Sequence, residues 1–187
     1  MSKTFPIEDV IPLIQHGHLH YGENKVQEAL DKWRDIKSKN NSIKLHLIGR
    51  LQTNKVKFAL KIFDYIHSLD SEKLANKIAD EQVKQEKKPK IFIQVNIGNE
   101  DQKSGINKEN LTDFYKFCKN LNLNIIGTMC IPPNDEKIVS YFSEMNKINQ
   151  EINLKELSMG MSGDYFEAIQ NNATYIRVGS KIFGNRV

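Results

Sequence analysis

Short apolar segments alternate with segments of helical periodicity along almost the whole chain, and this alternation restricts the folds that it can adopt. Seven segments have the apolar, β-branched character of buried strands: His18–Gly22, Leu45–Gly49, Tyr65–Leu69, Ile91–Asn96, Ile125–Ile131, Leu157–Met161 and Tyr175–Gly179. Between them, apolar residues recur at helical spacing, as at Val26, Ala29, Leu30 and Trp33, and at Ile138, Phe142, Met145, Ile148 and Ile152. Asn107 is predicted to cap a further helix that carries Leu111, Phe114 and Cys118. Strands separated by helices form parallel βαβ units, so the sequence predicts an α/β fold with a parallel sheet.

An eighth unit can be placed at the N-terminus. A helical stretch over Ile7–His16 directly follows Met1–Lys3, which is expected to form the stub of a further strand. Eight units predict a (β/α)8 TIM barrel, trimmed at its N-terminal edge, as a single domain over 1–187, although about 250 residues are usual for that fold. A doubly wound open sheet is the alternative. The barrel is favoured because no Gly-x-Gly-x-x-Gly motif follows an early strand.

Composition is typical of a soluble globular protein. Hydrophobic residues make up 39% of the chain and charged residues 27%, and no apolar run is long enough for a membrane span or a signal peptide. A net charge of +4 is too small for a nucleic-acid footprint unless the cations cluster. The basic segment Lys84–Lys90 is interpreted as a solvated helix end. Cys118 and Cys130 form no Cys-x-x-Cys pair, which fits a reducing compartment. We expect a cytoplasmic protein that binds neither nucleic acid nor membranes.

Small and glycine-rich segments follow the last two candidate strands. The segments are Ser158–Asp164 and Arg177–Gly184. In a barrel, the loops after strands seven and eight often bind phosphate, because glycine lets the backbone approach an anion and hydroxyl groups such as those of Ser162 and Ser180 add donors. Either loop alone also suits a plain turn, whereas the two together favour a phosphorylated ligand. Arg177 is expected near the barrel mouth, where its alternative role is to pair with a barrel carboxylate.

The histidines and Cys130 carry weaker signals. His16, His18 and His20 alternate as metal ligands can, but Gly17 interrupts them and His16 is expected to end the preceding helix, so no metal site is predicted. His46 and His67 are interpreted as core or barrel-end residues, and Cys130 as a small buried side chain.

Several motifs in a fixed order resemble those of the YggS/PROSC-type pyridoxal phosphate homeostasis proteins. They span nearly the whole chain: Ser2-Lys3-Thr4-Phe5-Pro6, Tyr21-Gly22-Glu23-Asn24-Lys25-Val26-Gln27-Glu28, His46-Leu47-Ile48-Gly49-Arg50-Leu51-Gln52-Thr53-Asn54-Lys55, Lys103-Ser104-Gly105-Ile106, Gly127-Thr128-Met129, Leu157-Ser158-Met159-Gly160-Met161-Ser162, Arg177-Val178-Gly179-Ser180 and Ile182-Phe183-Gly184. Each motif is ordinary by itself, whereas the ordered set is specific to that family.

The resemblance implies an alanine-racemase-like barrel that holds pyridoxal 5′-phosphate (PLP) at its mouth. The family's Schiff-base lysine falls on Lys3, which by itself would be taken for a solvated terminal lysine. The remaining implied contacts are Met161, Ser162, Gly179 and Ser180 at the phosphate, Asn24 facing the cofactor, and Arg177 at the pyridine nitrogen. Family members usually have a helix and a full first strand before the Ser-Lys motif, and this chain has neither.

The same resemblance favours a carrier over an enzyme. A guanidinium only donates hydrogen bonds, so an arginine at the ring nitrogen disfavours its protonation and weakens the cofactor as an electron sink. Alanine racemases also have an arginine there, but they add a second domain, which this chain lacks. We expect a monomer that buffers or delivers PLP without efficient catalysis and contacts PLP-dependent apo-enzymes transiently. The alternatives are a minimal PLP-dependent amino-acid racemase or lyase, and a cofactor-free regulatory barrel.

Overall fold

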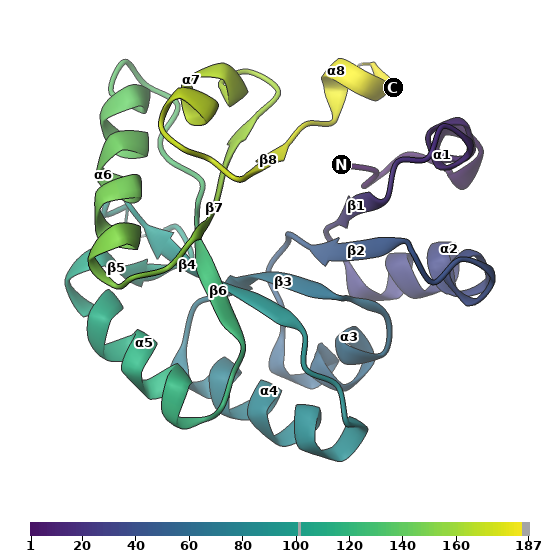
Figure 1. The fold of residues 1–187 in the computed structure, drawn as a ribbon, viewed down its shortest axis with the longest axis horizontal. Helices are drawn as coiled ribbons and strands as arrows, with labels where there is room; N and C mark the ends of the chain where they lie inside the picture. The colour runs from purple at the N-terminus through teal and green to yellow at the C-terminus, as the bar shows by residue number, and fades with distance from the viewer. Residues whose placement is uncertain (101, 185–187) are drawn as a thin grey trace.

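The structure is a computed structural model that describes residues 1–100 and 102–184 (Figure 1). Its strands are β1 (His20–Glu23), β2 (Lys44–Leu47), β3 (Tyr65–Leu69), β4 (Lys90–Asn96), β5 (Ile106–Asn107), β6 (Ile125–Cys130), β7 (Glu156–Met161) and β8 (Tyr175–Arg177). The helices are α1 (Ile7–Gln15), α2 (Val26–Lys39), α3 (Val56–Ile62), α4 (Glu72–Gln85), α5 (Leu111–Asn120), α6 (Ile138–Glu151), α7 (Tyr165–Gln170) and α8 (Ser180–Phe183), with 3-10 turns at Thr53–Lys55 and Lys108–Asn110. Within the described ranges, no helix combines the length and apolarity needed to cross a membrane.

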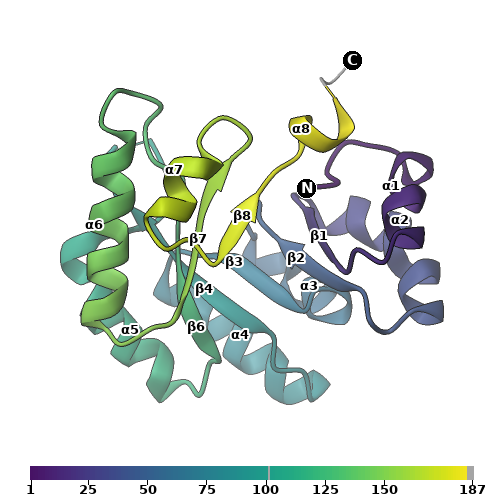
Figure 2. The same ribbon diagram turned by 45° about the horizontal axis from the view of Figure 1, so that its top comes forward.

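The strands form one parallel sheet that curls into a nearly closed barrel. Their order is β1-β2-β3-β4-β6-β7-β8, and the short β5 pairs with β4 outside this path. The Met1 nitrogen donates to the Val178 carbonyl beyond β8, and the Ser2 N–H donates to the Gly22 carbonyl of β1 at 3.1 Å. The first residues therefore lie between β8 and β1, as Figures 1 and 2 show from two directions. They stand where the predicted strand stub was expected but are not part of a regular strand.

The predicted barrel is confirmed, and the differences lie at element ends. His18 and Leu19 precede β1 instead of belonging to it. Gly179 is not a strand residue, because it caps α8. Asn107 stands at the N-cap position of the 3-10 turn that continues directly into α5, as predicted, but its side chain makes no capping hydrogen bond.

Two separate apolar clusters stabilise the barrel. The larger one fills the layer between the sheet and the helices, where α2 buries the face of Val26, Ala29, Leu30 and Trp33 that its spacing predicted. The smaller one contains Tyr65, Phe92 and Met129, with Tyr175 packed against it. The Tyr175 ring of β8 contacts Tyr65 of β3 at 5.9 Å and Phe92 of β4 at 5.2 Å between ring centroids. Because these strands are not neighbours of β8 in the sheet, the aromatic side chains meet inside the barrel.

Candidate functional site

A cavity of about 420 Å³ opens where β7 and β8 end. One side is formed by Met1, Lys3 and Phe5, and the other by the loops after β7 and β8, through Met161, Ser162, Gly163, Gly179, Ser180 and Gly184. The cavity therefore lies at the carboxyl ends of the strands, where barrels place their ligand sites.

The β7 loop is shaped by Gly160 and Asp164. Gly160 has a φ of +87°, and a Cβ at this position would lie 2.5 Å from the Cβ of Ala168 on α7, so only glycine fits without strain. The Asp164 carboxylate accepts a hydrogen bond from the Met161 N–H, which closes the turn into α7. These contacts bring Ser162 to the edge of the cavity.

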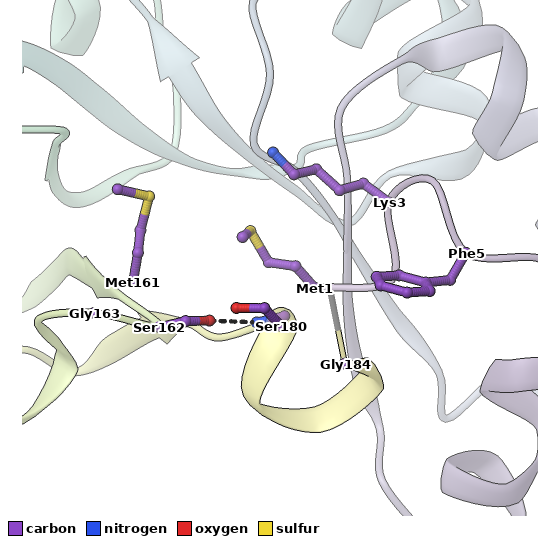
Figure 3. A pocket seen from close by; sticks show the side chains of 9 residues that line it. Met1, Lys3, Phe5, Met161, Ser162, Gly163, Ser180 and Gly184 are labelled. Carbon is purple, nitrogen blue, oxygen red and sulfur yellow. Dashed lines mark hydrogen bonds between the residues drawn. The ribbon is translucent and has the colours of Figure 1, made fainter. Parts of the chain in front are cut away.

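Ser162 connects the two loops. Its hydroxyl oxygen accepts a hydrogen bond from the Gly179 N–H at 3.2 Å (Figure 3). Gly179 in turn begins α8, whose first residue is Ser180. The first N–H groups of a helix have no partner within the helix, so they are donors available to a ligand. Two hydroxyl groups and the backbone of two loops thus converge at one place.

Lys3 faces these loops from the N-terminal segment. Figure 3 shows the side chains of Lys3 and Met1 directed into the cavity from the N-terminal segment and that of Met161 from the end of β7. The Phe5 ring stacks on the Phe183 ring of α8, with 4.8 Å between ring centroids. This stacking joins the segment that carries Lys3 to the last helix.

Five of the predicted site residues meet in this cavity: Lys3, Met161, Ser162, Gly179 and Ser180. Asn24 does not line it. The residue follows β1 and lines a second cavity of about 350 Å³ together with Arg50 and Lys55. The Asn24 backbone packs closely against Gly49, where a Cβ would lie 2.3 Å from the Asn24 carbonyl oxygen.

Arg177 does not line the Lys3 cavity either. It is 5% exposed and donates hydrogen bonds to the Ser158 hydroxyl and to the Cys130 carbonyl, both at 2.8 Å. It lines a smaller interior cavity of about 80 Å³, and Met1 lines both cavities and so stands at their boundary. Burial lowers the pKa of the Arg177 guanidinium from its ordinary value. The predicted alternative, a carboxylate partner, is not observed among residues 1–100 and 102–184, because the two groups that accept from Arg177 are uncharged oxygens.

Three histidines lead from Arg177 to the opposite end of the barrel. Ser158 bonds to the His67 Nδ1, the His67 Nε2 to the His46 Nδ1, and the His46 Nε2 to the His20 Nδ1, each at 2.9 Å. Burial lowers the pKa of His46 to about 3 and that of His67 well below its ordinary value, so both rings are neutral.

His46 and His67 are buried, as predicted for core or barrel-end residues, whereas the chain that they form with His20 was not predicted. Their positions in the sequence could have indicated the contact, because each is the third residue of its strand and the two strands, β2 and β3, are neighbours. Two further predictions are confirmed: His16 is the C-cap of α1, and Cys130 is fully buried. No group of histidine, cysteine or acidic residues suited to a metal ion occurs among residues 1–100 and 102–184.

Comparison with known proteins gives one consistent result. The family model described as alanine racemase, N-terminal domain, matches residues 3–187. The pyridoxal phosphate homeostasis protein of Aquifex aeolicus is 38% identical over 195 residues, which cover 99% of this chain and 85% of that protein. The structure of PipY from Synechococcus elongatus without PLP is 32% identical and superposes with a TM-score of 0.90, covering 98% of this chain and 90% of that one. The structure of PipY with PLP bound is 31% identical with a TM-score of 0.89 and the same coverage. This chain therefore belongs to the alanine racemase N-terminal-domain family and, within it, to the pyridoxal phosphate homeostasis proteins.

Proposed function

We propose that this protein binds PLP through a Schiff base at Lys3 and takes part in PLP homeostasis as a buffer or carrier, without efficient catalysis. The observation that carries the proposal is that the Lys3 side chain and two glycine- and serine-rich loops line the same cavity. The PLP-bound structure of PipY, which has the same fold, supports the choice of ligand.

The donors in the cavity suit the two reactive ends of PLP. Ser162 and Ser180 offer uncharged hydroxyl donors to a phosphate, whose charge also favours the beginning of a helix. The Gly179 N–H, which donates to the Ser162 hydroxyl in this structure, would exchange that partner for the phosphate. The cofactor supplies an aldehyde as electrophile. The neutral amine of Lys3 would bond to the aldehyde carbon while the aldehyde oxygen leaves as water. Arg177 would reach the pyridine nitrogen once the Met1 side chain moves from the boundary between the two cavities.

The cavity lining favours a carrier over a racemase. A racemase needs a second acid–base group on the cofactor face opposite the lysine. Among the described residues, the titratable groups in the lining are the Lys3 amine and the Met1 amine; burial lowers the pKa of the Met1 amine to about 6, and this amine is held by its hydrogen bond to the Val178 carbonyl. No carboxylate, phenol or imidazole from the described part of the chain lines the Lys3 cavity, and the nearby phenol and imidazole groups line the interior cavity that contains Arg177.

A spectrum followed by covalent trapping tests the proposal. Added PLP should give a visible absorption band, and borohydride reduction followed by peptide mapping should place the label on Lys3. Lys3→Ala should lose the band and the label, whereas Lys25→Ala, at an exposed lysine paired with Glu28, should keep both. Labels scattered over surface lysines would refute the Lys3 site.

Two further measurements separate carrier from enzyme. The loaded protein should reactivate a PLP-dependent apo-enzyme, such as an aminotransferase, in the presence of a scavenger that removes free PLP. Exchange of the α-proton of alanine into deuterated water should not exceed that of free PLP. Exchange well above that level would favour the racemase alternative.

A further inference from the structure

The turn that presents Lys3 has a backbone conformation that needs external support. The Phe5 N–H donates to the Ser2 carbonyl at 3.3 Å, which closes a tight turn with Lys3 and Thr4 at its centre. Thr4 has a φ of +68°, in the left-handed region that β-branched residues rarely adopt. Local preference therefore works against this turn, so contacts from elsewhere in the fold must stabilise it.

Those contacts come from Lys32, in the middle of α2. Its ammonium group donates to the Ser2 carbonyl at 2.7 Å and to the Phe5 carbonyl at 2.8 Å, the two ends of the turn. It also donates to the Glu23 carboxylate at 3.0 Å. An ammonium group has three N–H donors, so each has an acceptor here. The Lys32 side chain is only 13% exposed, which makes this an interior contact.

Glu23 fixes Lys32 and the turn to the core. One carboxylate oxygen accepts hydrogen bonds from the Ser2 hydroxyl at 2.8 Å, from Lys32 at 3.0 Å and from the Trp33 indole N–H at 2.9 Å. The Glu23 side chain is 2% exposed and Trp33 is fully buried. A buried ion pair that is held by hydrogen bonds from several elements is rigid, because any displacement leaves a charge unpaired in the interior.

We propose that Lys32 and Glu23 are positioning residues for Lys3: they hold the Ser2–Phe5 turn so that the Lys3 amine stays directed into the cavity. This inference rests on the proposed function, since it concerns how readily Lys3 reacts with PLP. Neither residue lines the cavity, so both act through the turn and not on the ligand. Loss of these Lys32 and Glu23 contacts, which we call the clamp, should slow bond formation at Lys3. It should leave the loops after β7 and β8, which are proposed to hold the phosphate, unchanged.

The experiment compares covalent trapping with non-covalent binding in Lys32→Met. Methionine has an unbranched side chain that is only one atom shorter, and it removes all three donors. The rate at which borohydride traps PLP on Lys3 should fall at least about tenfold, because small displacements of a reacting group have effects of this size or larger. Affinity for pyridoxine 5′-phosphate, which has an alcohol in place of the aldehyde, should stay within about threefold of the original. Lys32→Arg, which keeps charge and donors, should recover part of the trapping rate. Lys25→Met, at an exposed lysine just before the same helix, should change neither value.

A double variant guards against a folding defect. Lys32→Met with Glu23→Gln removes both charges and leaves no buried carboxylate without a counter-ion. It should fold as judged by circular dichroism and show the same slow trapping. Trapping at the original rate in Lys32→Met or in the folded double variant would overturn the proposal.

Trypsin cleavage after Lys3 provides a readout without any ligand. Release of the turn should accelerate cleavage of the Lys3–Thr4 bond at least about tenfold in the folded variants, because proteolysis follows local opening. If the unsubstituted protein does not trap PLP at Lys3, the proposed function fails, and cleavage alone then decides: faster cleavage supports the clamp and unchanged cleavage overturns it.

Discussion

Gly160 shows how one backbone position fixes the β7 loop. Alanine here would take a left-handed φ of +87° and place its Cβ 2.5 Å from the Ala168 Cβ and 3.1 Å from the Tyr165 Cα. We expect Gly160→Ala to lower the free energy of unfolding by about 2–4 kcal/mol, from backbone strain and overpacking together. Urea unfolding measures the loss. Gly163→Ala, where no atom lies within 4 Å of the added Cβ, should change it by less than about 0.5 kcal/mol. Similar losses in both variants would contradict this account.

At the same scale, the site divides into residues that local sequence can indicate and residues that it cannot. Ser162 and Ser180 were predictable because small residues directly follow the last two strands, and strand order then brings them together. Lys3 came from the family resemblance alone. Arg177 was expected at the mouth, but its hydrogen bonds to Ser158 and to the Cys130 carbonyl hold it inside the barrel. Those partners lie on other strands, so no local pattern reveals them.

At the scale of the elements, Ser71 and Asn107 both stand where a helix or a 3-10 turn begins, but they differ in whether the side chain makes a capping hydrogen bond. The Ser71 hydroxyl accepts a hydrogen bond from the Leu74 N–H at the start of α4, whereas Asn107 makes no capping bond. Ser71→Ala should therefore lower the free energy of unfolding by about 1 kcal/mol, and Asn107→Ala by less than about 0.5 kcal/mol. Thermal and urea unfolding measure both values. A larger loss for Asn107→Ala would restore the cap that the sequence suggested.

The strands themselves were predictable because β1, β2, β3, β4, β6 and β7 carry apolar residues that pack under the helices, and β8 places Tyr175 inside the barrel. Their ends were less so, since hydrogen bonding and not hydropathy decides where β1 begins and β8 stops. The two residues of β5 are too few to show any period. The histidine chain was missed because it depends on the register of β1, β2 and β3. This register pairs His46 with Tyr65, and His67 lies two residues further along β3.

The neutral histidines give the strands a pH dependence with a definite sign. His46 has a pKa of about 3 in the folded protein and about 6.5 when unfolded, so between these values only the unfolded chain binds the proton. The His46 contribution to the free energy of unfolding should therefore be nearly constant above pH 7 and fall as pH drops below 6.5, by about 2 kcal/mol at pH 5. His67 shifts in the same direction.

Urea unfolding at pH 7.5, 6.0 and 5.0 measures this dependence. His46→Gln keeps a donor and an acceptor but does not titrate, so it should reduce the slope even if it lowers stability throughout. A slope unchanged by His46→Gln would assign the acid sensitivity to other groups. A rise in stability on acidification would contradict the neutral state of these rings.

For the whole molecule, the net charge of +4 conceals an uneven distribution. Two adjoining cavities of about 540 and 320 Å³ share Lys37, Lys61, Ile62, Asp64 and Lys87. Together their linings contain the cations Arg34, Lys37, Lys44, Lys61, Lys87, Lys88 and Lys90 and one carboxylate, Asp64. This excess is larger than the net charge of the protein, so the rest of the chain is net acidic. The sequence showed only the part of this cluster within Lys84–Lys90, because α2, β2 and α3 contribute the remainder.

The cations that line these two cavities, together called the basic groove, repel one another. This repulsion should make the melting temperature depend on the salt concentration. The Debye length falls from about 20 Å at 20 mM salt to about 7 Å at 200 mM, so added sodium chloride screens the cations from one another. We expect the melting temperature to rise over this range. Lys87→Gln, at a residue that lines both cavities, should raise the melting temperature at 20 mM salt and reduce its salt dependence. Lys116→Gln removes a cation that instead pairs with Asp113 at 3.2 Å, so it should bring no such gain. A gain of equal size from both substitutions would mean that total charge, and not its concentration in the groove, limits stability.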